Sequence, residues 1–292
     1  MSEASEAISI GSIDDHRKRE KGVLVYPVYS RRSGGLSVGI NLFPDKKVCS
    51  FDCPYCEVFP FSKSLEFSLE LMEKDLRSVI TCALEKNIPV MDICFSGNGE
   101  PTLSPEFPGA LESAGRVRAE LVPGAELVLI TNGTGLLEEN VFSLLAEAAF
   151  SIDLNIWLKL DSGTPFWYNK INRSAVPFEK IIEKIKEFAA RAPVTIQTMI
   201  CAVDGKGPPE EEDEAWERLA LELVSISASG LRRDAGIRKV QIYGKARPAP
   251  EDPKAASLPL EQLEERAASL RAALVSAHIA EKKFFPPVEV YP

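Results

Sequence analysis

The stretch VCSFDCPYCEVF, residues Val48–Phe59, determines how the rest of the chain is interpreted. Three of the chain's six cysteines, Cys49, Cys53 and Cys56, fall within it in the spacing C-x3-C-x2-C. This spacing allows one loop to wrap three thiolates around a single inorganic centre and excludes a regular helix or strand. Iron–sulfur clusters usually take four cysteine thiolates, and structural zinc sites take four Cys or His ligands. A set of three therefore predicts a centre with an open fourth position, which favours catalysis over a purely structural role.

The rest of the sequence offers no obvious fourth ligand. Cys82, Cys94 and Cys201 fall in no C-x2-C pattern, and the two histidines, His16 and His278, are far from the loop in sequence. A structural zinc site completed by one distant ligand is an alternative. A disulfide fits less well, because nothing in the chain indicates secretion. The pattern favours a three-thiolate cluster.

The cysteine spacing also carries a family resemblance. Cys49, Cys53, Tyr55 and Cys56 resemble the C-x3-C-x-aromatic-C signature of the radical S-adenosylmethionine (radical SAM) enzymes. The resemblance implies a [4Fe-4S] cluster on the three cysteines, whose fourth iron binds the amino and carboxylate groups of SAM. The approach RRSGGLSVGINLFPDKKVCSFDCPYCEV, from Arg31 to Val58, is similar to the wyosine-synthase-like branch of that superfamily. More loosely, the match extends over about residues 23–245.

Composition is compatible with one large domain. A chain of 292 residues, 45% hydrophobic and 26% charged, can bury a large core. We expect a flexible segment over residues 1–22, a core barrel over 23–247 and a C-terminal helix and strand extension over 248–292. The first segment has no signal-like apolar run, and no run of about 18 apolar residues occurs anywhere. We therefore expect a cytoplasmic protein with no membrane partner, since cluster thiolates suit a reducing compartment.

The charge of the chain bears on nucleic-acid binding. A net charge of −9 opposes a general electrostatic footprint for nucleic acid. The basic run His16–Lys21 and the pair Arg31–Arg32 leave a local contact open. Such runs are usually solvated surface, so nucleic acid remains a possible partner that the net charge does not support.

Apolar, strand-like segments alternate with helical patterns along the chain. This alternation predicts an α/β fold, a partial parallel (β/α)6 TIM-like barrel with short N- and C-terminal additions, built from right-handed crossovers. After the barrel, we expect a helix at Leu260–Ser276 and a further strand within Phe284–Tyr291. The expected barrel strands are Leu36–Phe43, Val90–Phe95, Glu126–Thr131, Phe150–Leu160, Val194–Ala202 and Arg238–Tyr243. The expected helices between them are Glu66–Lys86, Leu136–Ala149, Pro177–Ala190 and Trp216–Ser227.

Polar residues follow these strands repeatedly, and the carboxyl ends of parallel strands converge on one mouth. They include Ser96–Glu100, Thr131–Asn132, Lys159–Asp161, Gln197 and Gln241. Each alone could be a satisfied loop residue, but their repetition predicts a shared site.

The resemblance implies roles for these residues. A GGEP-like segment after the second barrel strand binds the SAM amino group in the family, and the chain has GNGEP there, with Asn98 inserted. The residues so assigned to the amino group are Gly97, Asn98, Gly99 and Glu100. Tyr55 is expected to pack near the SAM adenine. Lys159 and Asp161 are candidates for the SAM carboxylate or ribose, and Asn132 and Gln197 are further candidates. Lys159 could equally be a surface lysine that extends to solvent.

The implied function is reductive cleavage of SAM to a 5′-deoxyadenosyl radical that acts on an unknown substrate. The implied partner is a reductant such as flavodoxin or ferredoxin. One alternative is a tRNA-base-modifying enzyme of the wyosine type, but those resemble enzymes with a second cluster, and no cysteine precedes Cys49. Another is a non-catalytic iron–sulfur or zinc binding protein, which would leave the GNGEP segment unexplained.

Overall fold

The computed structural model describes residues 23–58, 65–227, 234–247, 249, 255–281 and 285–292. The segment 1–22, with its basic run, lies outside the described residues, as does part of the C-terminal extension. The chain divides into two compact units, which are described separately. The first comprises Met1–Lys47 and Phe61–Val128, and the second comprises Val48–Pro60 and Leu129–Pro292. Strand β4 (Glu126–Thr131) crosses from the first unit into the second.

The first unit begins with a hairpin of β1 (Val25–Ser30) and β2 (Gly35–Ile40), which pair antiparallel around Gly34 at φ 71°. Strand β2 then pairs in parallel with β3 (Val90–Phe95). Between them runs α1 (Leu69–Glu85), which buries one apolar face. After β3 come the short 3-10 turn η2 (Pro101–Leu103) and α2 (Phe107–Leu121).

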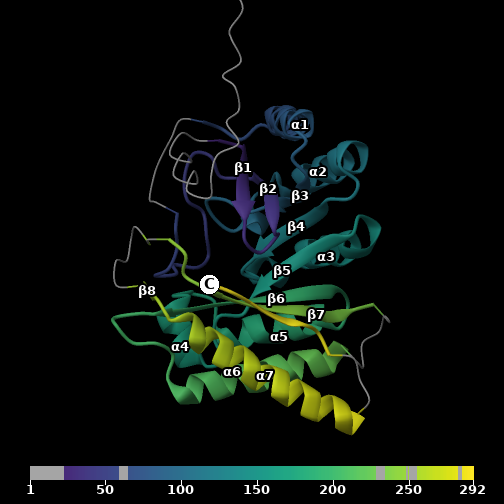
Figure 1. The fold of residues 1–292 in the computed structure, drawn as a ribbon. Helices are drawn as coiled ribbons and strands as arrows, with labels where there is room; N and C mark the ends of the chain where they lie inside the picture. The colour runs from purple at the N-terminus through teal and green to yellow at the C-terminus, as the bar shows by residue number, and fades with distance from the viewer. Residues whose placement is uncertain (1–22, 59–64, 228–233, 248, 250–254, 282–284) are drawn as a thin grey trace, which may run out of the picture. The chain divides into compact units, whose positions relative to one another are not determined.

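The second unit contains a parallel sheet of β5 (Leu154–Lys159), β6 (Pro193–Ala202), β7 (Gly236–Gly244) and β9 (Val288–Tyr291). The two-residue strand β8 (Ala256–Ser257) pairs antiparallel with β6. Helices intervene between successive parallel strands, as βαβ crossovers require. They are η3 (Thr134–Leu137), α3 (Glu139–Ser151), α4 (Pro165–Ile171), α5 (Phe178–Ala189), α6 (Glu210–Ser227) and α7 (Leu260–Glu281). Helix α6 packs against α5 and α7, and these helices run along one face of β6 and β7 (Figure 1).

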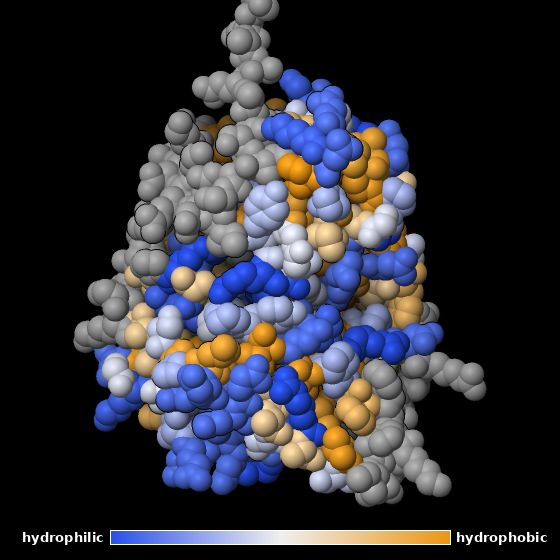
Figure 2. All heavy atoms as spheres, viewed as in Figure 1, coloured by the Kyte–Doolittle hydropathy of each residue, from blue (hydrophilic) through white to orange (hydrophobic). Residues whose placement is uncertain are grey.

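Helix α6 is polar on its outer side, and its first turn carries four acidic residues. Figure 2 shows mainly hydrophilic residues over α6 and α7, with apolar residues between them. Acidic side chains suit a helix N-terminus, where the backbone N–H groups point outward. None of the helices in the described residues combines the length and apolar composition needed to cross a membrane.

The predicted fold class, an α/β fold with a partial parallel (β/α)6 TIM-like barrel, is confirmed. One predicted strand, Phe150–Leu160, is wrong at its start. Helix α3 continues to Ser151, and β5 begins at Leu154 after Asp153, whose φ of 49° breaks the helix. Strand β1 and helices α2 and α4 were not predicted from the sequence. In α1, Met72 is fully buried, whereas Cys82 is half-buried.

Candidate cluster and cofactor site

The cysteine loop, Val48–Val58 in the described residues, contains no helix and no extended strand. Two local hydrogen bonds form turns within it. The backbone N–H of Phe51 donates to Cys49 Sγ at 3.4 Å, and the backbone N–H of Cys56 donates to the Cys53 carbonyl at 3.0 Å. Cys49 is exposed, whereas Cys53 and Cys56 are half-buried. The irregular loop predicted from the spacing is therefore present.

Asn132, just after β4, holds the Cys49 end of the loop. Its Oδ1 accepts hydrogen bonds from the backbone N–H and the hydroxyl of Thr134, at 3.0 and 2.8 Å. Its Nδ2 donates to Ser50 Oγ at 2.9 Å and contacts Cys49 Sγ at 3.6 Å. The hydroxyls of Ser50 and Thr134 lie 2.6 Å apart and close this group.

Asp161, two residues after β5, holds the other end of the loop. Its carboxylate accepts a hydrogen bond from the hydroxyl of Tyr55 and one from Asn172 Nδ2 at 2.8 Å. It also accepts one from the backbone N–H of Met199, at 2.8 Å. Burial, together with Asp161, raises the pKa of Tyr55 well above its usual value, so this hydroxyl stays protonated and donates. Asn172, at the end of α4, in turn contacts Cys53 Sγ at 3.7 Å.

Lys159, the last residue of β5, is an interior cation. Its Nζ lies 3.2 Å from Asp161 Oδ1 and donates to the hydroxyl of Tyr243 at 2.6 Å, and it sits 5.0 Å from the centroid of the Tyr55 ring. Only 13% of its side chain is exposed, so the alternative of a surface lysine is wrong. Burial opposes the charged form, but Asp161, with Tyr243 and Cys53, holds the pKa of Lys159 above its usual range.

The segment that carries Lys159 and Asp161 is itself held by α6. The indole N–H of the fully buried Trp216 donates to the Leu160 carbonyl and to Thr198 Oγ1, both at 3.1 Å. Gly163 lies so close to α6 that a Cβ there would come within 2.1 Å of the backbone nitrogen of Trp216. The end of β5 is therefore placed by packing against α6 as well as by its own hydrogen bonds.

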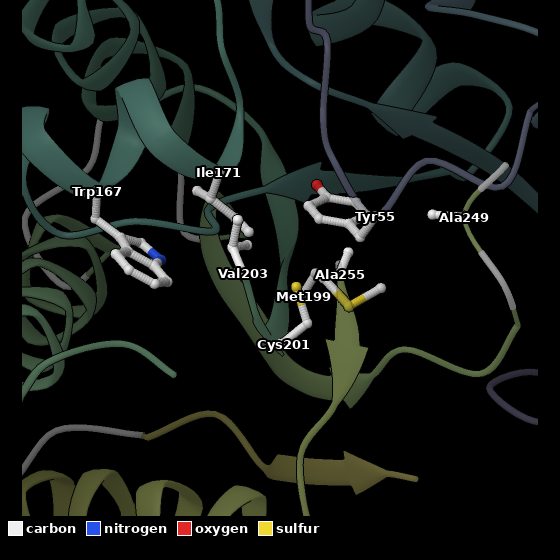
Figure 3. Packing of buried hydrophobic residues seen from close by; sticks show 8 residues of the cluster. All are labelled: Tyr55, Trp167, Ile171, Met199, Cys201, Val203, Ala249 and Ala255. Carbon is white, nitrogen blue, oxygen red and sulfur yellow. The ribbon is translucent and has the colours of Figure 1, made fainter. Parts of the chain in front are cut away.

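A hydrophobic cluster supports the inner side of the cysteine loop. Its members are Tyr55, Trp167, Ile171, Met199, Cys201, Val203, Ala249 and Ala255, and Cys53 packs against it. Figure 3 shows the Tyr55 ring on the same side of this cluster as Met199 and Ala255, with Trp167 at the opposite end. Burial, and next the charge of Asp161, raises the pKa of the Cys53 thiol to about 12, so without a metal this thiol stays protonated.

The three thiols of the loop are donors of the kind that iron–sulfur clusters take. All six cysteines lie in the described residues, and none forms a disulfide. Within the part of the chain that the structure describes, no three His, Cys, Asp or Glu side chains converge where one metal ion would bind. A cluster accepts each thiolate at a different iron, so its ligands need not converge on one point. Cys201, the other cysteine of the second unit, is a core residue with 1% exposure.

The GNGEP segment belongs to the first unit. A Cβ at Gly97 would come within 2.5 Å of Asn41 Oδ1, so only glycine fits there. The backbone N–H of Asn98 donates to the same Oδ1 at 3.1 Å, and the Asn98 side chain donates to the Phe43 carbonyl at 3.2 Å. Glu100 is 2% exposed, and its carboxylate accepts from the backbone N–H and hydroxyl of Thr102. The Asn98 side chain is therefore tied to the residues after β2, whereas the Glu100 carboxylate bonds to its own loop.

Gln197 lies inside the parallel sheet of the second unit, opposite Gln241 in register. The two are almost fully buried, and Gln197 Nε2 donates to Gln241 Oε1 at 2.7 Å. Gln197 is also level with Lys159 on the neighbouring strand. Lys159 at the end of β5 is thus in register with Gln197 and Gln241, which lie in the middle of β6 and β7 and not at strand ends as predicted.

Within the second unit, the predicted residues Asn132, Lys159 and Asp161 contact the cysteine loop, of which Tyr55 is a part. Asn172 belongs to this group and was missed, because a lone Asn at the end of a short helix has no distinguishing sequence pattern. Of the remaining predicted residues, Gln197 also belongs to the second unit, whereas Gly97–Glu100 belong to the first.

The family match agrees with this geometry. The Radical SAM superfamily matches residues 46–222, which include the cysteine loop and β3 to β6. The chain belongs to this superfamily. The resemblance drawn from the cysteine motif is therefore confirmed. In general the family implies SAM binding, typically a [4Fe-4S] cluster, a reductant and a substrate.

Individual relatives give further detail. A "UPF0026 protein" of Helicobacter pylori is 29% identical over 174 residues, which is 57% of this chain and 54% of that protein. The chain thus spans about half the length of that relative. A UPF0026 protein of Synechocystis is 27% identical over 68% of this chain and 69% of its own length. Among solved structures, a radical SAM methyltransferase from Sphaerobacter thermophilus superposes with a TM-score of 0.60 at 14% identity, over 91% of this chain and 68% of that one. At that identity the likeness concerns the fold alone.

Proposed function

We propose that this protein is an enzyme that reductively cleaves SAM at a [4Fe-4S] cluster held by Cys49, Cys53 and Cys56. The resulting radical would abstract a hydrogen atom from a substrate still to be identified. The observation that carries the proposal is the anchored loop: three thiols on one irregular segment, tied by Asn132 at one end and by Asp161 at the other. Membership of the radical SAM superfamily supports the same conclusion.

When bound, the reduced cluster supplies the electron that splits the SAM sulfonium into methionine and a 5′-deoxyadenosyl radical. The chain's own residues provide its environment. The hydrophobic cluster beneath Tyr55 excludes water from one side of the loop, which protects a reactive species from side reactions. Burial and Asp161 raise the pKa of the Cys53 thiol, and the ammonium of Lys159 acts against them by favouring the anionic form, which ligates iron.

The SAM contacts are part of the proposal. The backbone of Gly97, Asn98 and Gly99 is assigned to the SAM amino group, together with Glu100, and Tyr55 to packing near the adenine. We assign Lys159 and Gln197 to the carboxylate and ribose side, because both are interior polar groups on adjacent strands. Gly97 lets Asn41 approach the backbone of this segment more closely than any larger residue would permit, which fixes where the segment lies.

The remaining features of the proposal concern context. The electron donor would be a protein such as flavodoxin or ferredoxin, and the compartment the cytoplasm, where thiolates stay reduced. The core barrel would span residues 23–247, with 248–292 as an extension. In support, α7 and β9 of that extension pack against β7.

The test is anaerobic reconstitution followed by SAM cleavage. Wild-type protein should bind about four irons per chain, and with dithionite and SAM it should release 5′-deoxyadenosine even without substrate. Cys53→Ser should abolish both. About eight irons per chain would favour the two-cluster, wyosine-type alternative, and stoichiometric zinc would contradict the proposal. An intact reduced cluster that cleaves no SAM would favour the non-catalytic alternative.

A further inference from the structure

We propose that Asn132 and Asn172 donate hydrogen bonds to the thiolates of Cys49 and Cys53 and thereby set the reduction potential of the cluster. The inference rests on the proposed cluster site but goes beyond it, because neither asparagine is a ligand. It also gives Asn132 a role different from the SAM contact that the sequence suggested. Both are positioning residues that act through the sulfur atoms.

The geometry of Asn132 determines which of its atoms faces the sulfur. An amide side chain has one acceptor oxygen and two N–H hydrogens. The backbone N–H of Thr134 can only donate, so the atom it meets, at 3.0 Å, must be the amide oxygen. The amide nitrogen therefore faces the loop. One hydrogen is directed to Ser50 Oγ at 2.9 Å and the other to Cys49 Sγ at 3.6 Å.

The same reasoning determines the orientation of the Asn172 side-chain amide independently. A carboxylate only accepts hydrogen bonds, so the Asn172 atom 2.8 Å from Asp161 Oδ2 must be the nitrogen. Its second hydrogen is directed to Cys53 Sγ at 3.7 Å. The backbone of Asn172 is also tied to the loop, because its carbonyl accepts from the N–H of Asp52 at 2.9 Å. Asn172 is almost fully buried, so water competes little for this amide.

The two contacts have a common electrical consequence. Reduction adds an electron to the cluster, and part of the added negative charge resides on the cysteine sulfurs. An N–H group directed at a sulfur stabilises the more negative state more strongly, which raises the reduction potential. Asp161 orients Asn172 but adds a negative charge nearby, and Lys159 at 3.2 Å offsets that charge. The amides therefore act as neutral donors whose removal should make the cluster harder to reduce.

The experiment uses reconstituted full-length protein and three single variants. Asn132→Leu and Asn172→Leu keep side-chain size but remove the donor. Asn155→Leu is the matched control for the loss of an asparagine amide. The Oδ1 of this asparagine on β5 accepts a hydrogen bond from the hydroxyl of Thr195, on the neighbouring strand, at 3.3 Å. The readouts are iron content, the electron paramagnetic resonance signal of the reduced cluster and its midpoint potential in a mediated titration.

We expect each cysteine-facing variant to retain about four irons. At a given potential its ratio of reduced to oxidised cluster should be about tenfold lower than in wild type. For a one-electron couple this corresponds to a midpoint potential about 59 mV lower. The control should match wild type. Because the two amides face different thiolates, the double variant should show both shifts. Independently, wild-type protein labelled with ¹⁵N-asparagine should show ¹⁵N coupling to the reduced cluster in pulsed resonance spectra.

The outcomes separate this inference from the function on which it rests. Wild-type potentials in both variants, with the cluster intact, would overturn the inference alone. Should the variants fail to assemble a cluster, the absence of ¹⁵N coupling in the labelled wild type would overturn it equally. A wild-type chain that takes up no four-iron cluster would overturn the proposed function together with the inference.

Discussion

The buried pair Lys159–Asp161 gives a prediction that needs no cofactor. The Asp161 side chain is 0% exposed, and it accepts from Tyr55, Asn172 and the backbone of Met199 in addition to pairing with Lys159. Removing one partner of a buried pair leaves an uncompensated charge and typically costs about 3–5 kcal/mol. We therefore expect Asp161→Ala to lower the unfolding free energy of the cluster-free protein by about that amount.

A double-mutant cycle isolates the electrostatic part. In Lys159→Met the cation is gone, so losing Asp161 should cost less there than in wild type. We expect a coupling free energy of about 2 kcal/mol, within the range of about 0.5–3 kcal/mol found for residues in contact. The measurement is urea unfolding followed by circular dichroism, performed anaerobically without iron.

A surface pair provides the control for that cycle. Arg218 and Glu214 lie 3.4 Å apart with 69% and 62% of their side chains exposed, so a cycle of Arg218→Ala and Glu214→Ala should give a coupling of no more than about 1 kcal/mol. A coupling between Lys159 and Asp161 no larger than that of the surface pair would refute the reasoning. It would mean that solvent reaches the pair despite its burial.

Three further predictions concern the cluster, SAM and the end of β5. Cys201→Ala should retain about four irons, measured after reconstitution, because Cys201 packs in the core; loss of iron would make it a ligand. Glu100→Ala should keep the cluster but weaken SAM binding roughly ten- to a hundredfold, from the loss of about 1.5–3 kcal/mol, measured by calorimetry; unchanged affinity would contradict its assignment. Gly163→Ala should lower the unfolding free energy by at least about 1–3 kcal/mol, because its Cβ would meet the backbone of Trp216 at 2.1 Å. Gly124→Ala is the control, because a Cβ added there would meet no atom within 4 Å, and it should not lower the unfolding free energy. Equal stabilities of the two variants would show that the contact at Gly163 relaxes freely.

Much of the fold could be predicted because apolar runs in a parallel sheet are continuous and separated by helical periodicity. Val90–Phe95 and Glu126–Thr131 are predicted strands whose bounds match β3 and β4. The failure at Phe150–Leu160 has a local cause, since Ala148, Ala149 and Phe150 are apolar in either a helix or a strand. The break is made by Asp153 in the left-handed conformation, which periodicity does not detect.

The candidate site was less predictable, because its contacts depend on three-dimensional neighbours. The cysteine spacing and the polar strand ends led to Asn132, Lys159 and Asp161. Asn172 contacts Cys53 although it lies 119 positions later in the sequence. It stands at the end of a seven-residue helix that the sequence pattern did not predict. No spacing rule links residues so distant.

The contacts of Lys159 and Asp161 also distinguish two residues that the sequence treated alike. An ionised carboxylate has about four acceptor positions, and Asp161 meets Tyr55, Asn172, Met199 and Lys159. Binding the SAM ribose would therefore cost Asp161 one of the contacts that hold the cysteine loop. Lys159 has three ammonium hydrogens, and within the described residues its contacts to Asp161 and Tyr243 use two. A cofactor carboxylate would compete for the third with the rings of Tyr55 and Tyr243, 5.0 and 5.1 Å from Nζ, which hold a cation more weakly than a carboxylate does. We therefore infer that Lys159 contacts SAM while Asp161 positions the loop that carries the cluster.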